Sequence, residues 1–300
     1  MIIPNGARRL YIEIEGDPTA QPTLLALHGG PGFAHDYFRP GLTALARRGF
    51  AVIYVDLPGG GKSSRHPGAG SDLQPFLTDI AAIRSALRPE RLILLGHAWG
   101  AILAVEYALT APVAGVILVN PLRILRPEGQ DTAALARRVR ALDPGLYDRY
   151  LQRLQPLIER ARAGERNLWD RVNSDPWWAQ MMATQLAGPA SEEWRQAIAS
   201  ISWGIEAYFD FKGAAFADPG HPLNGYDLSE QTRGMRTPAL LFASDNDANY
   251  VAPARMHATM IAQSIPAARV VRMDDYGHFP FAEAPAPFAA AAADFLRNLG

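Results

Sequence analysis

The feature that most constrains the fold is a strand–turn–helix unit in the first half of the chain. Residues 92–95 form an apolar run typical of a buried strand, and an apolar helix is predicted to extend to Leu109. Between them lies the sequence Gly96-His97-Ala98-Trp99-Gly100. Glycines on both sides of such a turn let the strand and the helix approach closely, because no side chain separates them. The unit therefore predicts an α/β core in which residue 98 is presented at the end of a buried strand.

The same alternation of strands and helices recurs along the chain. Further buried strands are predicted at 23–27, 51–56, 115–119, 239–243 and 269–273, and helices at 38–48, 72–87, 253–265 and 285–299. Strands that alternate with helices are joined by right-handed crossovers, so we expect a mostly parallel sheet covered by helices on both faces. Residues 10–15 alternate apolar and polar side chains, which predicts a half-buried antiparallel strand at the edge of this sheet.

The pattern changes in the middle of the chain. Residues 121–235 are rich in Arg, Gln, Trp and Met, have helical periodicity and contain no convincing buried strand. We therefore expect two segments, 1–120 and 236–300, to form one α/β core, and residues 121–235 to form an inserted helical cap over the edge of the sheet where ligands bind.

Composition limits the classes of partner. The 300 residues carry a formal net charge of −1, which gives no field that would attract nucleic acid or an anionic membrane. The most apolar stretch, 92–120, is interrupted by His97, Glu106 and Pro112, so no membrane span is expected. The start of the chain lacks a secretory pattern, which favours a cytoplasmic location. There is no cysteine, metal cluster or cofactor motif, so we expect chemistry on a small molecule or short peptide without metal or cofactor. Nothing in the sequence fixes an oligomeric state.

The turn at residues 96–100 has the layout of a nucleophile elbow, G-x-S-x-G, with alanine in place of serine. A simple strand–helix turn without a catalytic role is the alternative. Alanine has no hydroxyl, so a histidine has nothing to deprotonate and no acyl-enzyme can form at Ala98. In a comparable enzyme, loss of the serine costs on the order of 10⁶ in turnover. We therefore expect no hydrolysis by the usual route.

Candidate partners follow later strands in the order expected for such a site. Two aspartates, Asp245 and Asp247, lie between the strand at 239–243 and the next helix; we favour Asp247 as the acid and assign Asp245 a turn or capping role. His278 follows the last strand in the sequence Tyr-Gly-His-Phe and is the candidate general base. An exposed structural histidine is the alternative reading of His278.

A glycine-rich loop follows the first buried strand. His28-Gly29-Gly30-Pro31-Gly32 can offer backbone N–H groups to a developing oxyanion, and the N–H of Trp99 would be a second donor. A turn without a catalytic role is the alternative. We therefore expect Gly29, Gly30 and Trp99 to form the oxyanion hole.

These residues together resemble a known family. The loop at 28–32, followed by Ala34-His35-Asp36-Tyr37, and the Trp directly after the elbow residue are similar to the prolyl iminopeptidases, which are α/β-hydrolases with the motif H-G-G-P-G-x-x-H-D-Y. The resemblance implies an α/β-hydrolase fold, the oxyanion role for Gly29 and Gly30, the roles of base and acid for His278 and Asp247, and a cap that closes the pocket. In that family acidic cap residues bind the substrate amine. The candidates in the corresponding segment here are Glu192, Glu193, Glu206 and Asp210, of which Glu206 is favoured.

Other residues bear on the substrate. The chain has Asp56-Leu57-Pro58-Gly59 where the iminopeptidases often have D-Q-R-G, and this is closer to esterases and lactonases. An N-terminal-proline peptide and a small apolar ester or lactone therefore both remain candidate substrates. The candidate substrate-binding residues are His28, Trp177, Trp178, Trp203, Glu206 and Phe279. Ordinary core packing is the alternative for the aromatic residues, and a solvated helix face is the alternative for Glu206.

Three interpretations of Ala98 remain. The first is an inactive variant of a serine enzyme, which the otherwise intact set of partners favours. The second is a natural lyase, cyclase or isomerase that uses His278 and Asp247 as a general base. The third is a ligand-binding protein of hydrolase ancestry, which would not need the acid–base pair.

Overall fold

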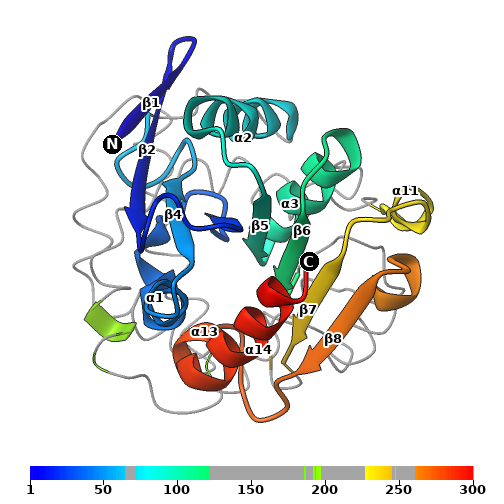
Figure 1. Ribbon diagram of the computed structural model, residues 1–300. Coiled ribbons are helices and arrows are strands. Elements are labelled where there is room, and N and C mark those ends of the chain that lie inside the picture. Colours follow the sequence, from blue (N-terminus) through cyan, green and yellow to red (C-terminus); the bar gives the residue numbers. More distant parts are fainter. Residues whose placement is uncertain are drawn as a thin grey trace, which may run out of the picture.

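Eight strands form one sheet in the order β1-β2-β4-β3-β5-β6-β7-β8 (Figure 1). The computed structural model describes residues 1–64, 72–121, 186, 192, 194–196, 227–244, 247 and 261–299. The strands are β1 (Ile2–Asn5), β2 (Arg8–Glu15), β3 (Thr23–Leu27), β4 (Ala51–Asp56), β5 (Leu92–His97), β6 (Gly115–Val119), β7 (Ala239–Ala243) and β8 (Ala268–Arg272). Strands β3 to β8 pair in parallel, whereas β2 is antiparallel to both β1 and β4. The expected mostly parallel α/β sheet is confirmed.

The helices lie between successive strands, except α13 and α14, which follow the last strand, β8. They are η1 (His35–Phe38), α1 (Arg39–Ala46), α2 (Gln74–Leu87), α3 (Trp99–Thr110), α11 (Ser229–Arg233), α13 (Pro280–Glu283) and α14 (Pro285–Arg297). Most of the predicted cap, residues 121–235, lies outside the described residues, as do residues 253–260 of a predicted helix. Within the described part of the chain, no helix combines the length and apolarity needed to cross a membrane.

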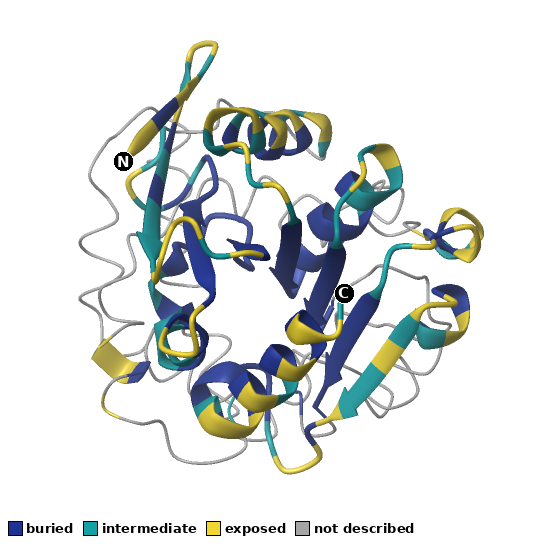
Figure 2. Ribbon diagram, viewed as in Figure 1, coloured by how far each residue is buried: buried dark blue, intermediate teal, exposed yellow. Residues whose placement is uncertain are grey.

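Two apolar layers, one on each face of the sheet, form the core. Alternate residues of each central strand belong to different layers: in β3, Leu24 and Ala26 pack with α1 and α14, whereas Leu25 and Leu27 pack with α2 and α3. Because both faces are covered, the central strands are buried throughout, and Figure 2 shows them enclosed by helices that expose only their outer sides. This is why the strands read as continuous apolar runs in the sequence.

The edge of the sheet differs from the expectation. Residues 10–15 were expected at an edge, but β2 lies between β1 and β4, and β1 is the strand at that edge of the sheet. β1 was not predicted, since four residues, Ile-Ile-Pro-Asn, give too short a pattern to recognise. Pro4, which cannot donate a ladder hydrogen bond, is compatible with this position at the edge.

Parallel pairing places the carboxyl ends of six strands, β3 to β8, at one edge of the sheet. The carboxyl ends of β3, β5, β6, β7 and β8 are followed by His28, Ala98, Asn120, Ser244 and the loop that carries His278. In open parallel sheets, ligands bind at this edge.

Candidate active site

Ala98 occupies a strained turn between β5 and α3. Its φ of 50° and ψ of −113° are unusual for a residue with a side chain, and its backbone N–H donates to the Val119 carbonyl at 3.0 Å. A Cβ on Gly96 would lie 2.4 Å from the Gly100 carbonyl oxygen, and a Cβ on Gly100 would lie 2.1 Å from that of Leu27. Both glycines are therefore required by the close approach of strand and helix. The geometry is that of a nucleophile elbow, with a methyl group in place of the nucleophile.

His278 and Asp247 lie together, as the sequence predicts. The Asp247 carboxylate Oδ2 is 2.7 Å from His278 Nδ1, and both side chains are buried. With Nδ1–H donating to the carboxylate, Nε2 becomes the ring nitrogen that can accept a proton. The competing acid, Asp245, lies outside the described residues.

Asn120, which was not predicted, joins the loops that carry the acid and the base. Its side-chain amide donates to the Ser244 Oγ at 3.0 Å and to the carbonyls of Gly277 and His278 at 3.1 Å each, while its Oδ1 accepts the Ser244 N–H at 2.9 Å. The side chain is fully buried. Asn120 thus connects the residue after β7 with the backbone of the candidate base. Its only sequence signal is a polar residue directly after the apolar strand β6.

The glycine-rich loop passes over position 98. A Cβ placed on Gly29 would lie 3.3 Å from the Ala98 Cβ, so this part of the loop is adjacent to the missing nucleophile. The Gly29 N–H, an expected oxyanion donor, donates to the Tyr37 hydroxyl at 2.6 Å. Gly30 has a φ of 118°, and a Cβ there would lie 2.9 Å from the Gly32 nitrogen, so this turn requires glycine. The Gly29 N–H is therefore already hydrogen-bonded within the protein, which does not fit its expected role as an oxyanion donor.

His28 holds this loop. Its Nδ1 donates to the Gly29 carbonyl at 2.8 Å, its Nε2 accepts the Leu57 N–H at 2.9 Å, and its side chain is 0% exposed. Burial lowers the pKa of His28 from 6.5 to about 4, so the imidazole is neutral near pH 7. The expectation that His28 contacts substrate does not fit this geometry, because both ring nitrogens are engaged by the backbone.

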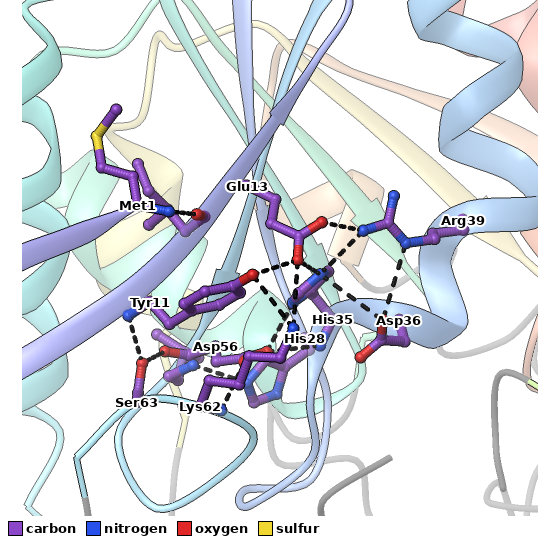
Figure 3. A network of polar contacts seen from close by, with 12 residues as sticks. Met1, Tyr11, Glu13, His28, His35, Asp36, Arg39, Asp56, Lys62 and Ser63 are labelled. Atoms are coloured by element: carbon purple, nitrogen blue, oxygen red, sulfur yellow. Dashed lines mark hydrogen bonds and ion pairs between the residues drawn. The ribbon is translucent and has the colours of Figure 1, made fainter. Parts of the chain in front are cut away.

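A polar network fixes the loop from outside (Figure 3). The Asp56 carboxylate accepts the His35 N–H at 3.0 Å, contacts the His35 Nδ1 at 2.7 Å and accepts the Lys62 N–H at 2.8 Å. Burial alone would raise the pKa of Asp56, but the hydrogen bond and charge of His35 and the Lys62 N–H together lower it. Glu13 extends the network to Arg39 and Tyr11. The network ties the turn after β4 to the start of η1.

The remaining predicted site residues are placed as follows. The Trp99 ring packs edge-on against Phe76 of α2, 4.9 Å between centroids, so only its backbone N–H is a candidate for the oxyanion site. Phe279 is fully buried, and its ring lies 5.3 Å from that of His97 and 5.4 Å from that of Trp194. Trp177, Trp178, Trp203 and Glu206 lie outside the described residues.

Comparison with known proteins agrees with this geometry. A family model described as the alpha/beta hydrolase fold matches residues 22–285. A proline iminopeptidase of Lactobacillus delbrueckii subsp. bulgaricus is 26% identical over 306 aligned positions, covering 98% of this chain and 96% of the relative.

Two solved structures share the fold. The proline iminopeptidase of Mycobacterium smegmatis superposes with a TM-score of 0.71 at 23% identity, covering 100% of this chain and 98% of that one. An esterase of Exiguobacterium antarcticum gives a TM-score of 0.71 at 19% identity, covering 99% and 98% of the two chains. With the elbow, the paired His278 and Asp247 and the order of these residues along the chain, the family match shows that this chain belongs to the α/β-hydrolase fold family.

Proposed function

We propose that this chain is the inactive, alanine-substituted form of a serine hydrolase that transfers an acyl group from an amide or ester to water. The observation that carries the proposal is the elbow: Ala98 has the backbone conformation of a nucleophile, and a buried His278–Asp247 pair lies on neighbouring strand ends. Only a hydroxyl is missing from the set that acyl transfer requires. Ala98 itself cannot form the acyl-enzyme.

In the serine form, the proposed roles follow from the geometry. The introduced hydroxyl would be the nucleophile, His278 would accept its proton through Nε2, and Asp247 would orient the ring through Nδ1. The backbone N–H groups of Gly30 and Trp99 would stabilise the oxyanion, because the Gly29 N–H already donates to Tyr37. No residue in these roles requires a metal or a cofactor.

For the substrate we propose an N-terminal-proline peptide or a small apolar ester or lactone. The first class is supported by the 26% identical relative named proline iminopeptidase and by the loop sequence at 28–37. The second is supported by the sequence Asp56-Leu-Pro-Gly, which is closer to that of esterases and lactonases than to the D-Q-R-G of the iminopeptidases.

The experiment is the Ala98→Ser variant, assayed beside the unchanged chain. Both proteins are treated with an active-serine phosphonate label and then with a proline arylamide and an aryl ester. Labelling and turnover only in the serine form support the proposal, and the ratio of arylamide to ester hydrolysis separates the two substrate classes. Ala108→Ser, which adds a serine in the last part of α3 away from the elbow, is the matched control and should remain unlabelled. No labelling of Ala98→Ser, despite a native melting transition, would refute the proposal.

A second candidate function is general-base catalysis without a nucleophile, as in a lyase or cyclase. The observation that favours it is that the 2.7 Å His278–Asp247 contact is retained in a chain that lacks the serine. The measurement is turnover of the unchanged chain on candidate substrates, compared with its His278→Ala variant. Turnover that survives this replacement would exclude His278 as the base.

A further inference from the structure

We propose that Tyr37 and His97 are positioning residues that couple the oxyanion loop to the backbone of the candidate base. Neither belongs to the nucleophile, acid, base or oxyanion set. The inference rests on the proposed function, since it concerns the alignment of that site. It is carried by three consecutive buried hydrogen bonds that run from Gly29 through Tyr37 and His97 to His278.

The first step is the direction of these bonds. The Gly29 N–H can only donate, so the Tyr37 oxygen accepts it at 2.6 Å. The His278 carbonyl can only accept, so His97 Nε2 carries the proton and donates at 3.0 Å. The Tyr37 hydroxyl then donates its hydrogen to His97 Nδ1 at 2.9 Å. One neutral tautomer of His97, with the proton on Nε2, satisfies every donor and acceptor in this series of hydrogen bonds.

The second step is that the two residues in the middle of this series of hydrogen bonds, Tyr37 and His97, are held in place. Tyr37 is fully buried between the rings of Phe38, 4.7 Å away, and Phe279, 5.8 Å away. Burial raises the pKa of Tyr37 well above its usual range, so the hydroxyl remains a hydrogen donor at neutral pH. The His97 ring is also buried and lies 4.5 Å from the His278 ring. With little freedom for either ring, a shift at one end is transmitted to the other.

The third step is where the two ends lie. Gly29 is the part of the loop next to Ala98: a Cβ built on it would lie 3.3 Å from the Ala98 Cβ, 3.1 Å from His97 Nδ1 and 3.3 Å from the Tyr37 oxygen. At the other end, the His278 carbonyl accepts from both His97 and Asn120. Asn120 fixes the base relative to the acid loop, and the Tyr37–His97 pair fixes it relative to the oxyanion loop. A misplacement of about 1 Å between such groups can cost about 10²-fold in rate.

The first test uses the chain with Ala98, labelled with ¹⁵N-histidine, so it does not depend on hydrolysis. We expect the His97 nitrogens, assigned through a His97→Gln variant, to show protonated Nε2 and an unprotonated, hydrogen-bonded Nδ1. In Tyr37→Phe the Nδ1 signal should move, because its donor is lost. A Nδ1 signal that is unchanged in Tyr37→Phe, or a protonated Nδ1 in the parent chain, would overturn the proposal.

The second test uses Ala98→Ser as the parent enzyme. Tyr37→Phe in this background should lower kcat by about tenfold to a hundredfold, with KM changed by less than about threefold, because the hydroxyl aligns reacting groups without binding substrate. Tyr54→Phe is the matched control: it also removes the hydroxyl of a fully buried tyrosine, which donates to Glu15 at 2.8 Å, and should leave kcat within about twofold. Unchanged kcat in Tyr37→Phe, or an equal loss in Tyr54→Phe, would refute the positioning role. If Ala98→Ser has no activity, the proposed hydrolase function fails, and the histidine spectra alone decide whether the Tyr37–His97 coupling exists.

Discussion

Acid should destabilise this protein through one buried histidine, His28. Its pKa is lowered by burial from 6.5 to about 4, so the unfolded chain binds a proton at His28 in this range while the folded chain does not. The stability that the neutral ring contributes is therefore fully present above pH 6.5 and is lost progressively as the pH falls towards 4. At about 1.4 kcal/mol per pH unit, the loss amounts to roughly 3 kcal/mol.

The assay is urea unfolding, followed by tryptophan fluorescence, at several pH values between 7 and 4. The difference in unfolding free energy between the unchanged chain and His28→Gln isolates this histidine, because every other titrating group is present in both proteins. At pH 7 the variant should be the less stable one, since Gln replaces a ring that bonds the Gly29 carbonyl and the Leu57 N–H. The difference should shrink by roughly 3 kcal/mol towards pH 4. A difference that does not vary with pH would refute the reasoning.

Three further replacements test the elbow and its supports by equilibrium unfolding. Ala98→Gly should stabilise the fold by about 1 kcal/mol, because glycine accepts the φ of 50° without strain, whereas Ala108→Gly in the regular part of α3 should destabilise it. A less stable Ala98→Gly would mean that the backbone is not strained. Gly100→Ala should cost at least about 3 kcal/mol because its Cβ would lie 2.1 Å from the Leu27 carbonyl oxygen, and Gly234→Ala, whose nearest neighbouring atom is 3.9 Å away, is the control. Asn120→Ala should cost about 2–4 kcal/mol because it leaves the buried Ser244 N–H without its acceptor; a loss under about 1 kcal/mol would show that the two loops do not depend on it.

The sheet was predictable because strands that are buried on both faces consist of consecutive apolar residues, and such runs can be recognised in the sequence. A strand such as β6 is covered by helices on each side, so all five residues are apolar and the run is easily recognised. Strand ends that converge at one edge then bring Asp247 and His278 together, although 31 positions separate them. The pairing of these two side chains followed from topology, and no detail of side-chain packing was needed.

The supporting hydrogen bonds could not be predicted in the same way. Tyr37 lies in the recognised loop motif and His97 in the elbow, yet neither spacing nor residue type indicates that one ring donates to the other. That bond depends on how η1 and the turn after β5 approach in space. The engagement of the Gly29 N–H, which bears on the oxyanion assignment, has the same origin. The edge strand β1 was missed for a different reason, since a short segment with one face exposed carries little periodicity.

The conformation of Ala98 is imposed by its surroundings and does not depend on the side chain at that position. The Val119 carbonyl accepts a hydrogen bond from the Ala98 N–H. Because Gly96 and Gly100 have no side chains, α3 can pack closely against β5 and β3 beside the turn. A φ of 50° costs an alanine on the order of 1–3 kcal/mol, with no catalytic gain in return. Since a serine has the same Cβ, its hydroxyl could be added at this position without rearranging the backbone. The strained turn, the buried His278–Asp247 pair and the bonds that hold the neighbouring loop are what acyl transfer requires, whereas simple ligand binding requires none of them. This is the physical argument for a hydrolase site that lacks one oxygen atom.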